Sequence, residues 1–217
     1  VVGIGGLVEI IPTMIVKSNV PTIASVKPYT PLELEGRDLY VKEGCYNCHS
    51  QMIRPLRYET ARYGEYSKSG EFVYDHPFQW GSKRTGPDLA REGGLRSNFW
   101  HYQHMIRPKV VSQGSIMPAY VWLKENDLDV SLIEKKIRAM QTLGVPYKKG
   151  YDKQALKDLK AQAEIIATDI VNNLPKEMQK SLNIPREIQQ LKKKEIVAII
   201  AYLQRLGTDI KAKTANK

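Results

Sequence analysis

The sequence predicts a mainly α-helical protein, in which an N-terminal membrane helix precedes a single helical domain. Three stretches of apolar residues support this fold class. Residues 1–16 are almost wholly apolar, and residues 152–174 and 195–206 carry apolar side chains at the spacing of an amphipathic helix. The first stretch is expected to lie in a membrane, and the other two are expected to pack with one face on a core.

The N-terminal apolar stretch, residues 1–16, would rise about 24 Å as a helix, against about 30 Å for the hydrocarbon core of a bilayer. The chain begins with valine rather than an initiator methionine, so we expect the C-terminal part of a transmembrane helix here. Gly3, Gly5 and Gly6 allow close helix packing, and Glu9 is costly in lipid unless it faces protein or water. These residues favour packing against partner helices. A signal-peptide core and a buried core helix are the alternatives.

The remaining chain is expected to form one domain on a tether. The parts predicted in order are a proline-containing extended tether at 17–32, a domain at 33–208 and a polar tail at 209–217. Within the domain we expect a loop-rich middle at 54–84 and a separable, Lys-rich helical insertion at about 146–192. The Lys-rich face of the insertion is interpreted as solvated surface in preference to a binding patch.

The most informative segment is Cys45-Tyr46-Asn47-Cys48-His49. Two cysteines separated by two residues and followed by histidine are the attachment signature of a c-type haem. Each thiol adds to one vinyl group of the porphyrin, and the adjacent histidine then becomes an axial ligand of the iron. A reduced redox pair or half of a zinc site is less well supported, because the chain has no further cysteine. We therefore predict one haem c bound covalently through Cys45 and Cys48, with His49 on the iron.

A second axial ligand is expected, because electron-transfer haems usually carry methionine or histidine on the sixth position. Met117 is the best candidate, since it lies in a short loop that Pro118 stiffens. A methionine that only fills a gap in the core is the alternative. His101, His104 and His76 are weaker candidates, and the methionines in helical segments are expected to be packing residues.

The segment Gly86-Pro87-Asp88-Leu89 fits beside the haem signature. A ligating histidine normally donates its second ring N–H to an oxygen atom, and the Pro87 carbonyl is the candidate acceptor for His49. Leu89 is then expected to pack against the haem ring. An ordinary Gly-Pro turn is the alternative interpretation.

Two terminal segments of the domain predict a class I-like cytochrome c arrangement. Residues 34–43 are expected to form a helix with Gly36 on one face, and residues 195–206 a helix that contains Tyr202 and ends at Gly207. In c-type cytochromes an N-terminal helix with a small residue crosses a C-terminal helix that carries a tyrosine. Gly36 would let the two backbones approach closely. Two unrelated surface helices are the alternative.

The chain is strongly basic, with a formal net charge of +10. Such a charge suits nucleic acid, a membrane surface or acidic partners. We exclude nucleic acid, because no zinc-finger or RNA-binding signature is present and the lysine excess lies late in the chain.

Longer motifs add a family resemblance. The segments 35–40, 48–55 and 74–91 resemble the mono-haem subunit, subunit II, of cbb(3)-type cytochrome c oxidases, the FixO/CcoO family. The resemblance extends from about Ile4 to Gly207. The block at roughly 148–192 is longer than expected for that family, which leaves its role open.

The resemblance implies a subunit that carries electrons and is not itself catalytic. Its family has one N-terminal helix in the bacterial cytoplasmic membrane and a periplasmic domain, with haem ligands that match His49 and Met117. Electrons would arrive from a di-haem cytochrome c subunit or a soluble cytochrome c. They would leave to a catalytic haem–copper subunit, where oxygen is reduced. Haem attachment on the outer side of the membrane agrees with this topology.

The loop-rich middle carries Arg54, Arg57, Arg84 and Trp80, which we expect around the haem. Arginine binds carboxylates through two parallel hydrogen bonds, so at least one of these arginines is expected to contact a haem propionate or the catalytic subunit. Solvated surface arginines are the alternative.

Three other functions remain open from the sequence. The mono-haem subunit of nitric oxide reductase shares the anchor and the haem, but should lack the 74–91 motif. A free-standing membrane-anchored carrier would shuttle electrons without a permanent partner. A haem-based gas sensor would need a weak or absent sixth ligand.

Overall fold

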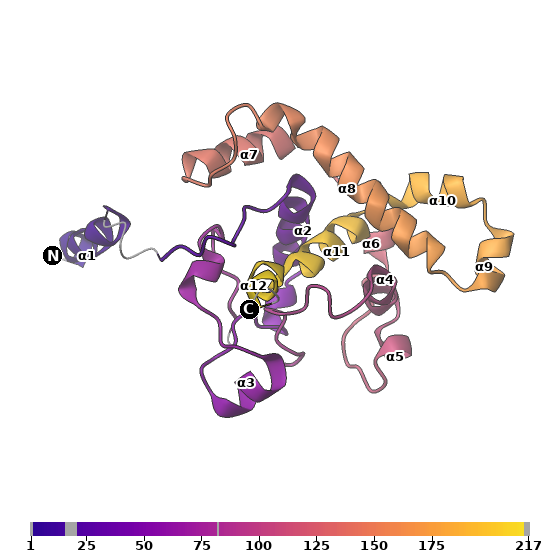
Figure 1. Cartoon of the computed structure of the whole chain (residues 1–217), viewed down its shortest axis with the longest axis horizontal. Helices are drawn as coiled ribbons and strands as arrows, with labels where there is room; N and C mark the ends of the chain where they lie inside the picture. The colour runs from indigo at the N-terminus through magenta and orange to yellow at the C-terminus, as the bar shows by residue number, and fades with distance from the viewer. Residues whose placement is uncertain (1, 16–20, 82, 215–217) are drawn as a thin grey trace.

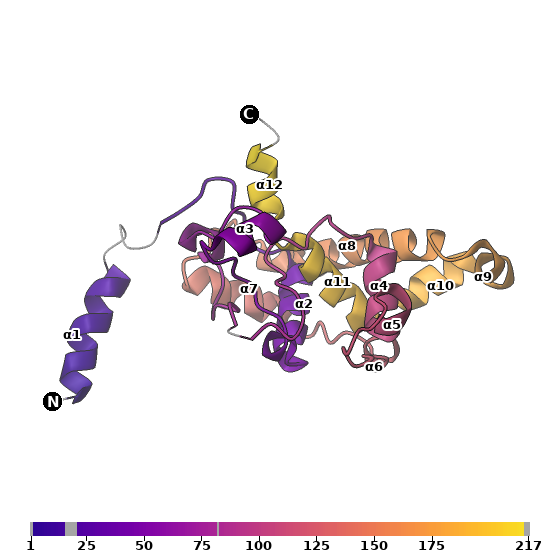
Figure 2. The same cartoon turned by 90° about the horizontal axis from the view of Figure 1, so that it is seen from below.

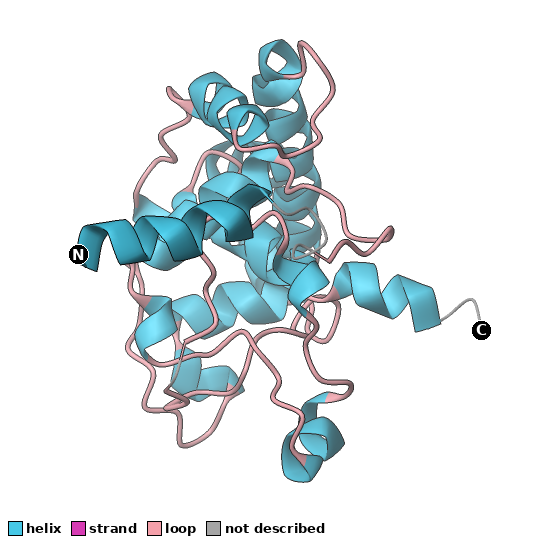
Figure 3. Cartoon of the chain, turned by 90° about the vertical axis from the view of Figure 1, so that its left-hand side faces the viewer, coloured by secondary structure: helices cyan, strands magenta, loops and turns pink. Residues whose placement is uncertain are grey.

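The computed structural model describes residues 2–15, 21–81 and 83–214. Helices and loops make up this part of the chain, and its only extended pairing is an isolated bridge between Asp127 and Lys194 (Figures 1 and 3). The elements in order are α1 (Val2–Ile15), α2 (Pro31–Lys42), η2 (Cys45–Asn47), α3 (Arg57–Tyr63), η3 (Ser69–Phe72), α4 (Asn98–Ile106), α5 (Pro108–Val111), α6 (Trp122–Glu125), α7 (Ile133–Thr142), α8 (Asp152–Asn172), α9 (Lys176–Ser181), α10 (Ile184–Leu191), α11 (Glu195–Arg205) and α12 (Thr208–Thr214). The mainly α fold class is therefore confirmed.

The centre of the domain is the crossing of α2 and α11. A methyl group on Gly36 would lie 1.9 Å from the Ala198 carbonyl oxygen and 2.9 Å from the Tyr202 Cβ, so only glycine permits this approach. The Tyr202 ring lies 5.4 Å from the ring of Tyr40, and both are buried. The predicted contact between a small residue and a tyrosine-bearing helix is thus present.

The start of α2 is determined by local sequence. Thr30 accepts the Glu33 N–H while the Glu33 carboxylate accepts the Thr30 N–H, and Pro31 occupies the first helical turn. The end of α11 is equally clear, because Gly207 adopts φ 76° directly after the helix.

The segment 21–30 is a non-helical stretch with one turn at 24–25, and it lies against the domain. The Lys27 N–H donates to the Asp209 carboxylate at 2.8 Å, and the Tyr147 hydroxyl donates to the Tyr29 carbonyl. The described end of the expected tether is therefore attached to the domain, and its residues 17–20 lie outside the described part. Of the expected tail, residues up to 214 form α12, and 215–217 lie outside it.

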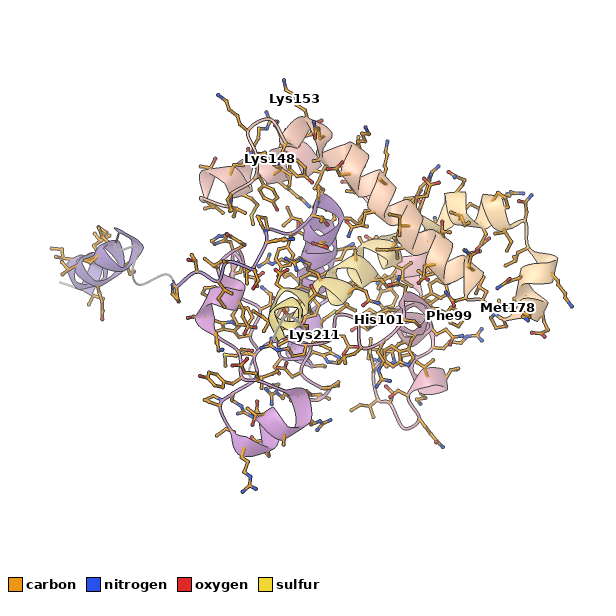
Figure 4. All side chains as sticks on the ribbon, in the orientation of Figure 1. Phe99, His101, Lys148, Lys153, Met178 and Lys211 are labelled. Carbon is orange, nitrogen blue, oxygen red and sulfur yellow. The ribbon has the colours of Figure 1, made fainter. Side chains whose placement is uncertain are left out.

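Helix α8 forms a wall of the core and contacts α2, α4, α7, α10 and α11. Leu159, Ala163, Ile166 and Ile170 are buried along one face. The apolar face of α8 is part of the main core, so this helix packs on the domain, and the expected insertion at about 146–192 stays a prediction. Lys148 and Lys153 instead extend outward from the outer side of the molecule (Figure 4). The short helix α9 is peripheral, and its Met178 is 51% exposed, contrary to the packing role expected of it.

Helix α1 stands apart from the domain in both views (Figures 1 and 2). It exposes apolar side chains, among them Val2 at 90% and Ile4 at 70%. A methyl group on Gly3, Gly5 or Gly6 would contact nothing within 4 Å. Across residues 2–15, 21–81 and 83–214, every helix is too short or too polar to cross a membrane.

Candidate functional site

The Cys45–His49 segment follows α2 directly. Gly44 adopts a left-handed conformation, φ 70°, which breaks the helix and allows the chain to turn into η2. The His49 N–H donates to the Cys45 carbonyl at 3.0 Å and closes this turn. Cys45 and Cys48 are free thiols, and burial raises the pKa of Cys45 to about 12, so its sulfur is protonated at neutral pH.

A cleft of about 440 Å³ opens beside this turn. Its size is typical of a cofactor pocket. The cleft is lined by side chains from α2, α4 and α11, from the Cys45–His49 segment and from two loops. They include Tyr40, Cys45, Cys48, His49, Pro87, Leu89, Glu92, Arg96, Trp100, His101, His104, Met105, Met117, Tyr120, Ile199 and Leu203. The two thiols, the predicted iron-binding histidine and the predicted methionine therefore meet in one space.

His49 is held by the loop that was predicted to hold it. Its Nδ1 lies 2.8 Å from the Pro87 carbonyl oxygen. Because a carbonyl can only accept, Nδ1 carries the proton and Nε2 keeps its lone pair. Burial lowers the pKa of His49, which keeps the ring neutral. Gly86 packs directly against the His49 ring, because a methyl group at this position would lie 2.3 Å from the His49 Cε1.

The Met117 loop connects α5 to α6. The Met117 N–H donates to the Ser115 hydroxyl at 3.2 Å, and the Tyr120 N–H donates to the Met105 carbonyl at 2.7 Å. The first bond lies within the loop, and the second connects the loop to the end of α4. Met117 is half-buried, packs against the core and lines the cleft.

Two other candidate ligands also line the cleft. His101 is buried, and its Nε2 lies 3.7 Å from a Glu92 carboxylate oxygen. Burial, followed by electrostatic interactions with His104 and Arg96, lowers the pKa of His101 to about 4. Burial also lowers the pKa of His104. Both rings are therefore neutral at neutral pH. His76 is exposed and lies outside the cleft.

Arg84 does not line the cleft, and its guanidinium instead bonds to residues that follow His49 in the chain. Its guanidinium donates to the Ser50 hydroxyl at 2.6 Å, the Met52 carbonyl at 2.7 Å and the Glu59 carboxylate at 2.8 Å. The Asp88 carboxylate accepts from the Ser50 hydroxyl and from the Met52 N–H. These contacts connect the chain after His49 to the loop that holds its ring.

The remaining members of the expected haem surroundings also lie outside the cleft. Arg54 pairs with Glu59, and Arg57 is exposed on α3. The Trp80 ring stacks on Phe78 at 4.5 Å. Arg54 and Arg84 are both paired with the Glu59 carboxylate, so a contact of these residues with the haem stays a prediction. A contact with a partner subunit stays a prediction.

One wall carries a row of three side chains, of which sequence reasoning missed Arg96 and Trp100 and considered His104 only as an iron ligand. Arg96 lies just before the N-cap of α4, and Trp100 and His104 follow it at four-residue intervals within the helix; all three line the cleft. The Arg96 guanidinium lies 4.9 Å from the centre of the Trp100 ring, and the His104 ring stacks on Trp100 at 4.6 Å. The helical spacing of one arginine, one tryptophan and one histidine was the available signal.

The cleft fits a haem by the chemistry of its donors. Two thiols, one imidazole nitrogen and one thioether sulfur meet beside apolar walls from α11. Three buried polar atoms in the lining have no hydrogen-bond partner among the described residues: the Tyr40 hydroxyl, His101 Nε2 and His104 Nδ1. Such orphan groups at a cleft wall indicate that an occupant is part of the complete structure.

Comparison with known proteins agrees with this site. A family model described as the mono-haem subunit of cytochrome c oxidase, FixO, matches residues 1–210. The match extends through the Lys-rich block whose length was unexpected. No curated protein matches the chain. The chain therefore belongs to the FixO family, the mono-haem subunits of cbb(3)-type cytochrome c oxidase.

Proposed function

We propose that this chain is the electron-relay subunit of a cbb(3)-type haem–copper oxidase and carries a single, covalently bound haem c. The observation that carries the proposal is the meeting of Cys45, Cys48, His49 and Met117 in one cleft. Family membership supports the assignment to an oxidase complex.

Each of these residues has a role that its surroundings support. Cys45 and Cys48 would form the two thioether bonds, and His49 Nε2 and the Met117 sulfur would bind the iron. The Pro87 carbonyl orients His49 and raises the basicity of its ring. When bound, haem c supplies reversible one-electron chemistry. With His49 and Met117 both on the iron, the haem would keep no open position for oxygen, which fits a subunit that relays electrons.

The partners follow from an electron relay. A di-haem cytochrome c subunit or a soluble cytochrome c would donate electrons, and the catalytic haem–copper subunit would accept them. The exposed apolar side chains of α1 support membrane association, because large apolar surfaces in water normally mark an interaction site. Covalent attachment of the haem would put the domain on the periplasmic side of the bacterial cytoplasmic membrane.

The test is extraction of the full-length protein from its native membrane in mild detergent. We expect it to co-purify with a multi-span haem–copper subunit and with oxygen-reducing activity. Recovery of the chain alone would contradict the proposal and favour a membrane-anchored carrier. A co-purified complex that reduces nitric oxide instead would assign the chain to nitric oxide reductase.

A further inference from the structure

Arg96, Trp100 and His104 form a stacked column on one wall of the cleft. The column runs from guanidinium to indole to imidazole, with separations of 4.9 Å and 4.6 Å. The indole and imidazole planes differ by 11°, so the two rings are nearly parallel. Ser97 caps the start of α4 by accepting the Trp100 N–H, which fixes the base of the column.

Both ends of the column have unused donors. Within residues 2–15, 21–81 and 83–214, Arg96 accepts a hydrogen bond from Gln204 at its backbone carbonyl, and its guanidinium has no ion pair or hydrogen bond. The ring contact of the guanidinium with Trp100 leaves its N–H groups available. His104 Nδ1 is buried without a partner. An arginine fork and a buried imidazole N–H on one wall suit an anionic, carboxylate-bearing edge of the occupant.

The charge around the column agrees with such an occupant. Glu92 is the one acidic side chain among the described residues of the cleft lining. Burial raises the pKa of Glu92, while the nearby positive charges of Arg96 and Lys211 act to lower it. It lies beside His101, and no ion pair with Arg96 forms. Because Arg96 is not paired with a carboxylate among the described residues, its guanidinium is available to bind a carboxylate of the occupant.

We propose that Arg96 and His104 bind the propionate carboxylates of the haem, with Trp100 packed between them as a spacer. This inference rests on the proposed function, because it takes the occupant to be haem c. It moves the propionate contacts from the 54–84 loop to α4. Both residues are positioning residues that also set the electrostatic environment of the iron.

The test is a spectroelectrochemical titration of the haem-loaded full chain. Arg96→Gln removes a positive charge beside the propionates, so the oxidised haem becomes relatively more stable. We expect about a tenfold change in the reduction equilibrium, which is about 59 mV downward for one electron. Arg186→Gln is the matched control, because this exposed arginine lies on α10, away from the cleft, and its loss should leave the potential unchanged.

A pair of variants tests His104 separately. His104→Phe keeps the stacking on Trp100 but removes the donor, so the potential should again fall. His104→Gln restores a donor and should return part of the shift. The absorption band of methionine–iron coordination should persist in both. If Arg96→Gln does not accumulate, Arg96→Lys and this pair decide the question.

Three results would overturn the inference. Equal potentials for the wild type, Arg96→Gln and Arg186→Gln would show that Arg96 is not near the propionates. Loss of the methionine–iron band in His104→Phe would show that His104 acts on the iron instead. A wild-type chain without covalent haem would refute the proposed function and this inference with it.

Discussion

Gly86→Ala is the substitution that most directly perturbs His49 without changing a proposed ligand. Gly86 lies against the imidazole, whose Nδ1 donates to the Pro87 carbonyl at 2.8 Å. A methyl group at Gly86 would lie 2.3 Å from the His49 Cε1, whereas ordinary contact begins at 3.4 Å. The ring must therefore retreat by about 1.1 Å, the difference between these two distances.

The cost follows from this displacement. Moving the ring away from Gly86 carries the His49–Pro87 bond beyond the roughly 3.2 Å limit of a good hydrogen bond. Overpacking costs about 1 to 3 kcal/mol, and a lost hydrogen bond about 0.5 to 1.5 kcal/mol. We expect a loss of about 1.5 to 4.5 kcal/mol in the free energy of unfolding. A less basic His49 also stabilises the oxidised iron less, so the reduction potential should rise.

The assay combines denaturant unfolding with a redox titration of haem-loaded protein. Gly6→Ala is the control, because a methyl group there meets nothing within 4 Å and the backbone keeps negative φ. A Gly86→Ala protein with wild-type stability and wild-type potential would refute the proposed packing of His49 on Gly86.

Further predictions concern the sixth ligand, the wall of the core and a buried carboxylate. Met117→Ala should convert a low-spin absorption spectrum to a high-spin one, whereas Met178→Ala, at an exposed site on α9, should leave it unchanged. Ile170→Ala, at a buried side chain of α8, should lower the free energy of unfolding by about 2 to 5 kcal/mol in urea denaturation. Ile165→Ala, at a side chain 69% exposed on the same helix, should change it by less than about 0.5 kcal/mol. Burial alone would raise the pKa of Glu59, but hydrogen bonds from Arg84 and Arg54 outweigh burial and lower it to about 2. The stabilisation from Glu59 is therefore complete above its unfolded pKa of about 4.5 and is lost as the pH falls toward 2, so urea midpoints of the wild type and Glu59→Gln should converge over that range.

Much of the proposed iron-binding half of the site could be predicted from local sequence. The spacing of Cys45, Cys48 and His49 is imposed by the chemistry of attachment, and it does not depend on the rest of the fold. The His49–Pro87 bond and the crossing at Gly36 were predictable for a similar reason. The first depends on the short Gly-Pro segment beside the haem signature, and the second depends on a glycine where two helix backbones meet.

The opposite wall of the cleft could not be predicted in the same way. Arginines in the 54–84 loop and Arg96 look alike in sequence, and only the tertiary fold shows which of them meets an internal carboxylate. Arg84 is engaged by Glu59 and Asp88, which lie 25 and 4 residues away along the chain. Arg96 has no such partner among the described residues and reaches the cleft.

The role of α8 was also hidden in the sequence. Its amphipathic pattern predicted a helix with one apolar face, and it could not show what that face packs against. In the structure, Ala163 and Ile170 are buried in the core that contains α2 and α11. The lysines of α8 lie on its outer, exposed face, and they gave no information about the buried face that packs on the core.

The central claim is that this cleft holds one haem c on Cys45 and Cys48. The most direct measurement is the intact mass of the full chain, purified from its native membrane and denatured so that non-covalent ligands are removed. We predict the polypeptide mass plus one haem, and loss of that increment when both cysteines are replaced by alanine. A wild-type chain that carries only the polypeptide mass would contradict the claim.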